Sequence, residues 1–379
     1  MARRAIIIGA GIAGLSAAIA LRKAGWKVSL YEQAPSLEPM GAALSLWPNA
    51  MAALAWLGCD QPIRDAAQRL TCMSLADANG RIIAPVVVEH ILPGASLHVP
   101  SRTALQSALL AGLGDIVPNL GKRMAGFSQD DEAVRVRFES GGEAKADLLV
   151  AADGIWSKIA DQVLGTAPYH AGYGGILALS DAVAGHPSTG QGHEYWGNHE
   201  RFGLIDVADD CKYWFYMRNE ADPAESRALT KAMIGQRMTG WPSAIGAAIA
   251  ATPATRLIPF SIHARPAPKR LGLGRIVCVG DAAHAMEPNL GQGGCQALED
   301  AVALGIAARS ADVTGIVPAY ERMRLKRVRQ IVMLSKQAGI VPHHMPHWLS
   351  QIARVGMRTF MPALGRATQR EIYTLPDYV

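Results

Sequence analysis

The sequence contains little cysteine, and its cysteines show no pairing that would predict a disulfide framework. Five cysteines are scattered over 379 residues, and none forms a C-x-x-C pair. This pattern is typical of reduced thiols, so we expect a cytoplasmic protein. His343, His344 and His347 have no cysteine or carboxylate nearby in the sequence that would complete a metal site. We therefore expect no metal and a surface segment at these histidines.

The sequence also lacks a strong excess of charge of one sign. It has 37 Lys and Arg against 32 Asp and Glu, for a formal net charge of +5. The densest basic run, residues 322–329, carries Leu325 and Val328 at helical positions. We expect a solvated helix face here and no nucleic-acid partner. The modest positive balance favours anionic cofactors and substrates only weakly.

Only one uncharged stretch approaches the length of a membrane span. Arg3 and Arg4 precede the seventeen uncharged residues 5–21, a pattern shared by secretory signals and short membrane anchors. The stretch contains three glycines at the spacing of a nucleotide-binding turn, and the pattern continues to Glu32. This continuation favours a buried βαβ unit, so we expect no membrane partner.

The glycines of this stretch predict a dinucleotide-binding turn between a strand and a helix. Gly9 allows the sharp turn, Gly11 lets the backbone approach a pyrophosphate, and Gly14 lets the helix pack close to the strand. The helix N-terminus faces the phosphates, and Glu32, at the end of the second strand, accepts hydrogen bonds from ribose hydroxyls. The residues expected at the cofactor in this unit are Gly9, Ala10, Gly11, Ala13, Gly14, Glu32 and Gln33.

Alternating polarity, capping residues and apolar runs predict the other elements of the chain. Helices are expected at 48–57, at 102–112 after the capping residue Ser101, at 224–238, and from 293 onward. Hairpins are expected at 71–90 and 127–138, and strands at 147–152, 201–207, 212–217 and 275–281.

Three segments far apart in the sequence end a buried strand beside a glycine. They are the turn from Gly9 to Gly14, Asp153-Gly154 and Gly280-Asp281. Ligands bind at the carboxyl ends of strands in open α/β sheets, so we expect the three to meet at one extended cofactor. With Ser101-Arg102-x-x-Leu105 and the run 280–300, they resemble the flavoprotein aromatic hydroxylases related to para-hydroxybenzoate hydroxylase and salicylate hydroxylase. The resemblance covers residues 5 to about 335.

This resemblance and the predicted elements together imply an α/β fold with two domains and C-terminal helices. A Rossmann-like FAD-binding domain is interrupted by a mostly antiparallel β-sheet substrate domain. The FAD-binding domain is expected at 1–75, 98–168 and 274–335, the substrate domain at 76–97 and 169–273, and the C-terminal helical segment at 336–379.

The resemblance implies non-covalent FAD and a transiently bound NADH or NADPH. In the family, the acid matching Asp281 bonds the ribityl chain, and the residue matching Pro288 lines the reacting face of the flavin. Arg102 would reach the phosphate or ribityl region by charge-assisted hydrogen bonds. Backbone N–H groups at a helix start would face the flavin where its reduced form carries negative charge. Those N–H groups belong to Gly291, Gln292 and Gly293, and the remaining residues expected at the cofactor are Ser45, Asp153 and Gly294.

Two positions depart from the family pattern. Position 295 often holds Asn in the family and is Cys295 here. The arginine expected three residues after Ser157 is Ala160, and Lys158 is the only cation nearby in the sequence. The first departure removes an amide group beside the flavin, and the second removes a cation expected to serve the nicotinamide.

An aromatic-rich region, residues 193–216, is the expected source of the substrate pocket. Alternation along a strand places Tyr213 and Phe215 on one face and Trp214 and Tyr216 on the other, without indicating which face meets the flavin. We expect the pocket between Pro288 and the strands that carry Arg201 and either Tyr213 or Tyr216. Arg201 either holds an anionic substituent of the substrate or only stabilises the fold.

The resemblance implies an FAD-dependent monooxygenase for small aromatic or heteroaromatic rings. In the family, NAD(P)H reduces the flavin, O2 forms a flavin hydroperoxide, and its distal oxygen is transferred to the ring. Two alternatives stay open: a dehydrogenase or halogenase on the same scaffold, and a flavin-binding protein without activity. Monomer and homodimer are both compatible with the sequence.

Overall fold

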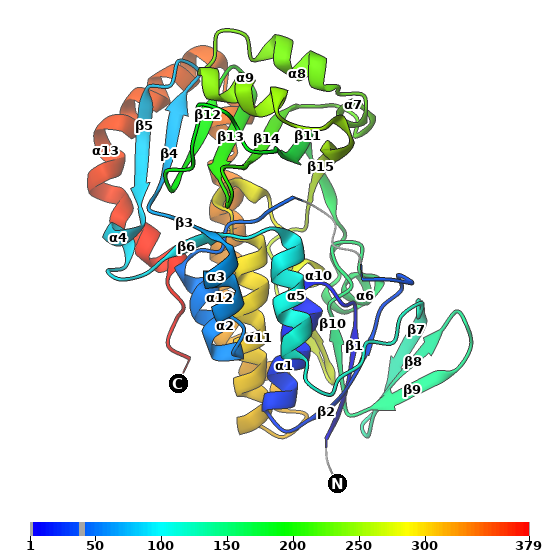
Figure 1. Cartoon of the computed structure of the whole chain (residues 1–379). Coiled ribbons are helices and arrows are strands. Elements are labelled where there is room, and N and C mark those ends of the chain that lie inside the picture. Colours follow the sequence, from blue (N-terminus) through cyan, green and yellow to red (C-terminus); the bar gives the residue numbers. More distant parts are fainter. Residues whose placement is uncertain (1–2, 38–41, 379) are drawn as a thin grey trace.

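The computed structural model describes residues 3–37 and 42–378. Two sheets form its main blocks, one in the lower half and one in the upper half of Figure 1, with long helices running between them. The predicted α/β class is confirmed. Among the described residues, no helix combines the length and the apolar character needed to cross a bilayer.

A five-stranded sheet brings together segments from three parts of the chain. Its order is β16-β17-β10-β1-β2, and all neighbours run parallel except β16 and β17. The N-terminal apolar stretch supplies β1 and the helix α1, so it folds as the expected strand, turn and helix. The bounds are β1 Arg4–Ile8, α1 Ile12–Lys23, β2 Lys27–Tyr31, β10 Leu148–Ala151, β16 Gly272–Leu273 and β17 Ile276–Cys278.

A seven-stranded sheet forms the upper block in the order β15-β11-β14-β13-β12-β4-β5. Only β12 and β4 pair in parallel. The predicted domain boundary at residue 75 falls inside β4. The bounds are β4 Cys72–Asp77, β5 Ile82–Val87, β11 Tyr169–Leu179, β12 Gln191–Trp196, β13 Glu200–Asp206, β14 Lys212–Asn219 and β15 Ile258–Ala264.

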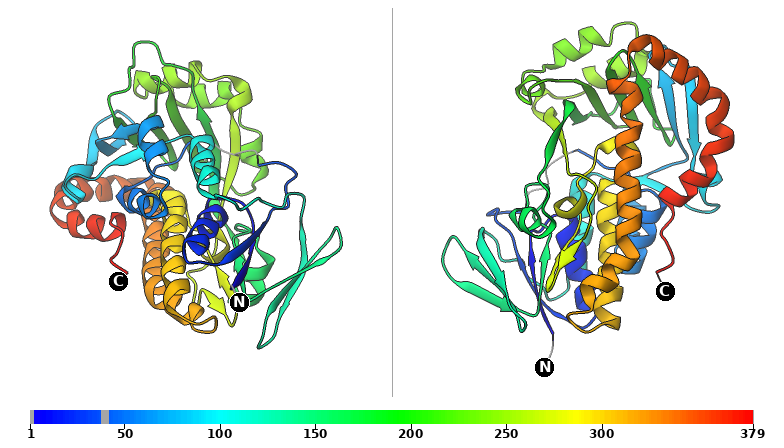
Figure 2. Two further views of the ribbon diagram at one scale, coloured as in Figure 1. Left: turned by 60° about the horizontal axis from the view of Figure 1, so that its bottom comes forward. Right: turned by 180° about the vertical axis from the view of Figure 1, so that it is seen from behind.

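Three short helices cover the outer face of this sheet (Figures 1 and 2). They are α7 Ala224–Arg227, α8 Lys231–Arg237 and α9 Ser243–Ala250. The prediction of one continuous helix over 224–238 is wrong, because the chain leaves the helix at residues 228–230. The Thr230 hydroxyl then accepts the N–H of Met233 and starts a new helix. A capping threonine inside an apolar periodic stretch therefore divided the element.

The remaining helices and strands connect and cover the two sheets. Up to residue 146 they are α2 Pro48–Leu57, α3 Gln61–Ala66, β3 Gln68–Leu70, α4 Val88–Ile91, β6 Leu97–Val99, α5 Arg102–Gly112, β7 Met124–Gln129, β8 Val134–Phe138 and β9 Glu143–Ala146. The later ones are α6 Lys158–Leu164, η1 Ala254–Arg256, α10 Asp281–His284, η2 Pro288–Leu290, α11 Gly293–Ser310, α12 Ile316–Ala338, η3 Ile340–His344 and α13 His347–Tyr373.

A fully buried ion-pair network joins α11 to α12. Arg324 donates from Nε to Asp300 at 2.7 Å and from Nη1 to Glu299, and none of the three side chains is exposed to solvent. The second carboxylate oxygen of Asp300 accepts the N–H of Gly280 at 2.8 Å and lies 2.6 Å from Nε2 of His284. The cations hold the pKa values of both carboxyls below their usual range. The turn at Gly280 is thereby fixed to both long helices.

We expect Arg324→Met to lower the free energy of unfolding by about 3 to 5 kcal/mol, because it leaves buried carboxylates without their main cation. Urea denaturation followed by circular dichroism measures the change. Arg135→Gln is the matched control, since Arg135 pairs with Asp130 in an exposed ion pair. The control should leave the midpoint nearly unchanged. Equal midpoints for the two variants would contradict the expected role of Arg324.

Candidate flavin and substrate site

The glycine turn after β1 has the geometry that a bound pyrophosphate requires. Gly9 has a φ of +102°, and a Cβ there would lie 2.3 Å from the carbonyl oxygen of Ala152. A Cβ on Gly14 would lie 1.8 Å from the carbonyl oxygen of Gly9, so close packing requires glycine at both positions. A Cβ on Gly11 would meet nothing within 4 Å. Gly11 thus presents open backbone at the N-terminus of α1, where an anion is stabilised.

Glu32 lies directly beside this turn. Its carboxylate accepts the N–H of Ala10 at 2.7 Å and the N–H of Ala34 at 2.9 Å. These two bonds fix the carboxylate next to the open space over Gly11. A carboxylate at this place fits the ribose hydroxyls of a dinucleotide. Gln33 follows Glu32 in the same loop.

The Gly280 turn packs against the first glycine turn. Gly280 has a φ of +58°, and a Cβ on it would lie 2.6 Å from the Cβ of Ala13. Asp281 follows as the first residue of α10 and is exposed. The structure thus brings two motifs that are far apart in the sequence to the carboxyl edge of the first sheet, as expected from the strand ends.

The segment before α2 runs along the start of α5. The N–H of Leu44 donates to the carbonyl of Pro100 at 3.2 Å, and the N–H of Arg102 donates to the carbonyl of Ala42 at 3.2 Å. Ser45 belongs to this segment, and its carbonyl oxygen lies 3.4 Å from the thiol of Cys295. The Cys295 side chain is buried, and burial raises its pKa to about 12. The thiol therefore serves packing between the segment and α11.

Asp153 occupies the third strand end. Its Cα would lie 3.0 Å from a Cβ on Gly9, which places it beside the glycine turn. Its Oδ1 atom is buried and has no hydrogen-bond partner among the described residues. Burial raises the pKa of the carboxyl to about 6. A Cβ on the following residue, Gly154, would meet nothing within 4 Å.

Sequence reasoning missed Arg265, which shapes the loop after Asp153. The guanidinium is fully buried and donates from Nη2 to the carbonyl of Ile155 at 2.6 Å and from Nη1 to the carbonyl of Thr166 at 2.7 Å. It also pairs with Asp161 at 2.8 Å. Arg265 comes from the chain just after β15, so a buried cation reaches the segments that flank α6, the helix in which Ala160 replaces the expected arginine. No local sequence pattern could have assigned this contact.

Three buried polar atoms near the start of α11 have no hydrogen-bond partner among the described residues. They are Nε1 of Trp47, Oδ1 of Asn49 and Nε2 of Gln292. A Cβ on Gly291 would lie 3.0 Å from the Trp47 nitrogen, whereas one on Gly293 would meet nothing within 4 Å. Buried polar atoms normally find a partner, so these groups fit a polar cofactor or ordered water at this place. Pro288 in η2 and Gly294 in α11 flank the same segment.

The two faces of β14 differ in what they contact. Trp214 and Tyr216 pack in the outer cluster under the short helices, and the Tyr216 hydroxyl donates to Glu200 at 2.7 Å. Tyr213 and Phe215 point the other way and pack against the core of the first block. Tyr216 therefore does not share a face with Tyr213, and of the two tyrosines only Tyr213 lies on the side of the sheet that meets the first block. The choice between Tyr213 and Tyr216 depended on which face of the sheet the short helices cover. The alternation of side chains along β14 does not indicate that face.

Arg201 lies on the same face of the sheet as Tyr213 and is buried. Its Nε donates to Glu194 at 2.7 Å, and its Nη2 lies 2.6 Å from the same carboxylate oxygen. Its Nη1 donates to the side-chain oxygen of Asn289, the residue after Pro288. The guanidinium therefore connects the sheet to η2 and already has a carboxylate partner.

His343 lies beside Arg201 in the interior, although the sequence predicted a surface segment here. Its ring is buried and stacks on Tyr173 with centroids 3.9 Å apart. Its Nε2 lies 3.3 Å from Nη1 of Arg201, and its Nδ1 lies 2.8 Å from the side-chain oxygen of Asn219. Burial and the nearby cation lower its pKa to about 2. Within residues 3–37 and 42–378, no group of three His, Cys, Asp or Glu residues could hold a metal ion.

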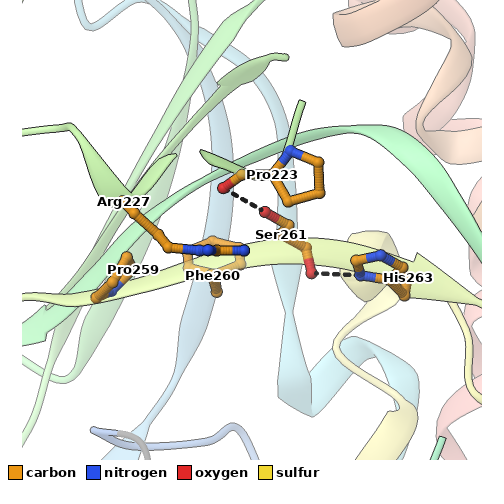
Figure 3. A pocket seen from close by; sticks show the side chains of 6 residues that line it. All are labelled: Pro223, Arg227, Pro259, Phe260, Ser261 and His263. Carbon is orange, nitrogen blue, oxygen red and sulfur yellow. Dashed lines mark hydrogen bonds between the residues drawn. The ribbon is translucent and has the colours of Figure 1, made fainter. Parts of the chain in front are cut away.

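A surface hollow lies at the free edge strand β15 (Figure 3). Its lining residues are Pro223, Arg227, Pro259, Phe260, Ser261 and His263. β15 is two strands away from β14 in the sheet order, and neither Pro288 nor Tyr213 lines the hollow. We therefore do not assign the reacting site to it.

Comparison with known proteins gives a consistent result. A family model described as FAD binding domain matches residues 3–335. Aurachin C monooxygenase/isomerase from Stigmatella aurantiaca is 33% identical over 341 residues, which cover 88% of this chain and 88% of that protein. FAD-dependent urate hydroxylase from Klebsiella pneumoniae is 33% identical over 353 residues, or 90% of each chain. The crystal structure of Klebsiella pneumoniae HpxO with FAD and uric acid matches with a TM-score of 0.89 and 30% identity, covering 98% of this chain and 96% of that one.

Asp281→Ala should weaken FAD retention more than Asp153→Ala, because we expect the exposed Asp281 carboxylate to bond the ribityl chain directly. Loss of a charge-assisted hydrogen bond costs roughly 1.5 to 3 kcal/mol, or about ten- to a hundredfold in affinity. Flavin absorbance per chain after gel filtration and dilution measures retention. Equal flavin occupancy in Asp281→Ala and the wild type would exclude this contact.

The flavin-free protein should lose stability as the pH rises from about 4 to 6. The pKa of the Asp153 carboxyl is about 6 in the folded chain and about 3.9 when unfolded, so the folded state holds the extra proton in this range. Below about pH 4 the Asp153 carboxyl is protonated in both states, so its burial does not lower the free energy of unfolding. Above about pH 6 the folded chain buries the charged carboxylate, and the full destabilisation is present. Asp153→Asn should therefore melt near the wild-type temperature at pH 4 and above it at pH 7. If the difference in melting temperature between Asp153→Asn and the wild type did not change between pH 4 and pH 7, the raised pKa of Asp153 would be contradicted.

Proposed function

The chain belongs to the family of FAD-dependent aromatic hydroxylases, and from this premise we propose that its substrate is a small, uncharged heteroaromatic or phenolic ring. It is an FAD-dependent monooxygenase, like its relatives. The observation that carries the substrate proposal is the contact of Arg201 with Glu194. Because this carboxylate already compensates the guanidinium charge, a second anion would meet little attraction there.

The relatives and the chain itself support this substrate class. One matching crystal structure contains uric acid, a nitrogen heteroaromatic compound. In this chain the proposed pocket lies between Pro288 and the sheet face that carries Tyr213 and Arg201. Burial raises the pKa of Tyr213 to about 12, so its phenol is neutral near pH 7 and can donate a hydrogen bond to a ring oxygen or nitrogen.

The division of work between the cofactor and the chain follows from the site. When bound, FAD supplies the redox chemistry with O2 and a nicotinamide reductant. The Gly11 backbone and Glu32 would hold its adenosine diphosphate half, and the start of α11 would place N–H groups near the flavin ring. Tyr213 would orient the substrate. We further propose transient binding of NADH or NADPH and a cytoplasmic location.

The alternatives receive less support. Relatives that cover about nine tenths of this chain are named as a monooxygenase and as hydroxylases, which favours hydroxylation over dehydrogenation or halogenation. The open backbone over Gly11 and Gly293 supports a flavin site with intact geometry.

Steady-state NAD(P)H oxidation with paired compounds tests the substrate proposal. Each pair consists of an uncharged phenol, hydroxypyridine or purine-like ring and its carboxylate derivative. We expect the uncharged member to accelerate oxidation with product formation by about tenfold or more over its partner, equivalent to about 1.4 kcal/mol. Faster turnover of the carboxylates would overturn the proposal while leaving the monooxygenase assignment intact.

Tyr213→Phe should keep its FAD and reduce coupled hydroxylation, with more NAD(P)H diverted to peroxide. Loss of one hydrogen bond of roughly 0.5 to 1.5 kcal/mol predicts an effect of about two- to tenfold on substrate affinity or coupling. Tyr216→Phe is the matched control, because its ring lies in the outer cluster. Unchanged coupling in Tyr213→Phe, or an equal loss in both variants, would place the pocket elsewhere.

A further inference from the structure

Four aromatic or aliphatic side chains on the inner face of the seven-stranded sheet are only partly buried. Tyr213 and Phe215 lie on β14, and the register places Leu179 and Leu177 directly opposite them on β11. Cross-strand partners share a face of a sheet, so the four side chains form one patch on the face opposite the short helices (Figure 1). We call Leu177, Leu179, Tyr213 and Phe215 the inner patch.

The side chains beside the inner patch on the same face are buried more deeply. Arg201, Ile205 and Met217 are 2%, 3% and 3% exposed. Solvent therefore reaches the inner patch itself, although this face of the sheet is turned toward the first block. An opening of this kind, lined mainly by apolar side chains with a single polar group, is typical of a small-molecule site.

The contacts of its neighbours place the inner patch at the proposed pocket. Burial raises the pKa of the Tyr213 hydroxyl to about 12, and the positive charge of Arg102, a residue expected at FAD, offsets part of the rise. In the register, Phe215 lies between Tyr213 and Met217, the residue opposite Arg201. The Arg201 side chain in turn bonds Asn289 beside Pro288. Phe215 is thus the middle of the sheet face that the pocket uses.

Gly203 allows the Phe215 ring to lie across the neighbouring strand. It is the residue opposite Phe215 on β13, and a Cβ there would lie 2.1 Å from Cε1 and 2.3 Å from Cζ of the ring. The ring therefore fills the volume that any side chain at position 203 would need. Because the ring lies over β13, the space above β14 and β11 stays open. The ring centroids of Phe215 and Tyr213 are 6.4 Å apart and tilted by 55°, so the two rings do not stack on each other.

The chemistry of the inner patch indicates which ligand would cover it. The Tyr213 hydroxyl is its one hydrogen-bonding group, since leucine and phenylalanine side chains have no polar atom. A single ring held at Tyr213 would leave Phe215 and Leu177 in contact with water. A fused apolar ring would remove this surface from water, whereas nitrogen or carbonyl groups there would lose water without gaining a partner.

We propose that the inner patch binds a flat, fused aromatic substrate whose second ring is a carbocycle. Phe215 and Leu177 receive the second ring, and Gly203 determines the room for it by keeping Phe215 on the sheet. The inference rests on the proposed function and narrows its substrate class. Gly203 and Phe215 are therefore specificity-determining residues, and neither takes part in the chemistry.

Isothermal titration calorimetry of the FAD-loaded protein tests the proposal without relying on turnover. The ligand pairs are phenol with 2-naphthol and hydroxypyridine with hydroxyquinoline. The wild type should bind the fused member of each pair at least about tenfold more tightly, and 2-naphthol more tightly than uric acid, whose two rings carry polar atoms all round. Equal binding within the pairs, or tighter binding of uric acid, would overturn the proposal.

Gly203→Ala should reduce the preference for the fused member to below about threefold, because the displaced Phe215 ring enters the open space, and should change single-ring binding by no more than about twofold. Gly246→Ala is the matched control, since a Cβ on Gly246 in α9 would meet nothing within 4 Å. The double variant Gly203→Ala, Phe215→Val should restore the preference to at least about fivefold, because valine lacks the ring atoms that the new Cβ meets. An unchanged preference in Gly203→Ala, an equal loss in the control, or no recovery in the double variant would overturn the proposal.

FAD content and melting temperature report whether the variants fold. If Gly203→Ala loses flavin, Leu177→Asn replaces it and should weaken binding of the fused members alone. Product analysis separates this inference from the proposed function. Preferred binding of fused rings without any hydroxylated product would contradict the proposed function and leave the inner patch as a binding site. Hydroxylation of single rings without a preference for fused ones would overturn the inner patch alone.

Discussion

The arrangement of the flavin site depends on the fully buried contact between Arg324 and the carboxylates of Glu299 and Asp300. Burying three charged groups is costly, and it is tolerated only when each charge is paired and hydrogen-bonded. That condition is met here, because Asp300 also accepts from Gly280 and lies against His284, while Glu299 also pairs with Arg327. The position of the Gly280 turn is therefore coupled to the packing of α11 on α12. Any shift between these helices would move Asp281.

Arg265 plays the same part for the other flavin loop. Both arginines are fully buried, both come from outside the motif that they hold, and both bind several acceptors at once. The planar guanidinium with five donors is suited to this, since one side chain fixes the path of a whole loop. The loss of the expected arginine at position 160 is thus accompanied by a cation that approaches the loop from β15.

Features set by neighbouring residues could be predicted from the sequence, and features set by distant packing could not. The glycine turn at Gly9 and the capping of α5 by Ser101 follow from local backbone chemistry, and the structure has both. The face of β14 that meets the first block depends on where the helices α7 to α9 fold back, so the choice between Tyr213 and Tyr216 stayed open. His343 illustrates the same limit, because its burial depends on stacking with Tyr173 and contact with Arg201. Within one sequence, a polar residue near prolines carries no sign of such distant partners.

The C-terminal helix links the outer surface to the interior of the site. Its buried face is held to β12 through Arg354, and at its end Tyr373 stacks on Trp47 with ring centroids 3.9 Å apart. Trp47 in turn lies against Gly291 at the start of α11. The chain after the helix is held by Arg327, which donates to the carbonyls of Ile372 and Thr374. One helix therefore covers the sheet with one face, exposes Trp348, Ile352 and Val355 with the other, and packs against the loop at Gly291 through Tyr373 and Trp47 at its last turn. Because a helix is stiff, its outer surface and this loop have a fixed mutual orientation.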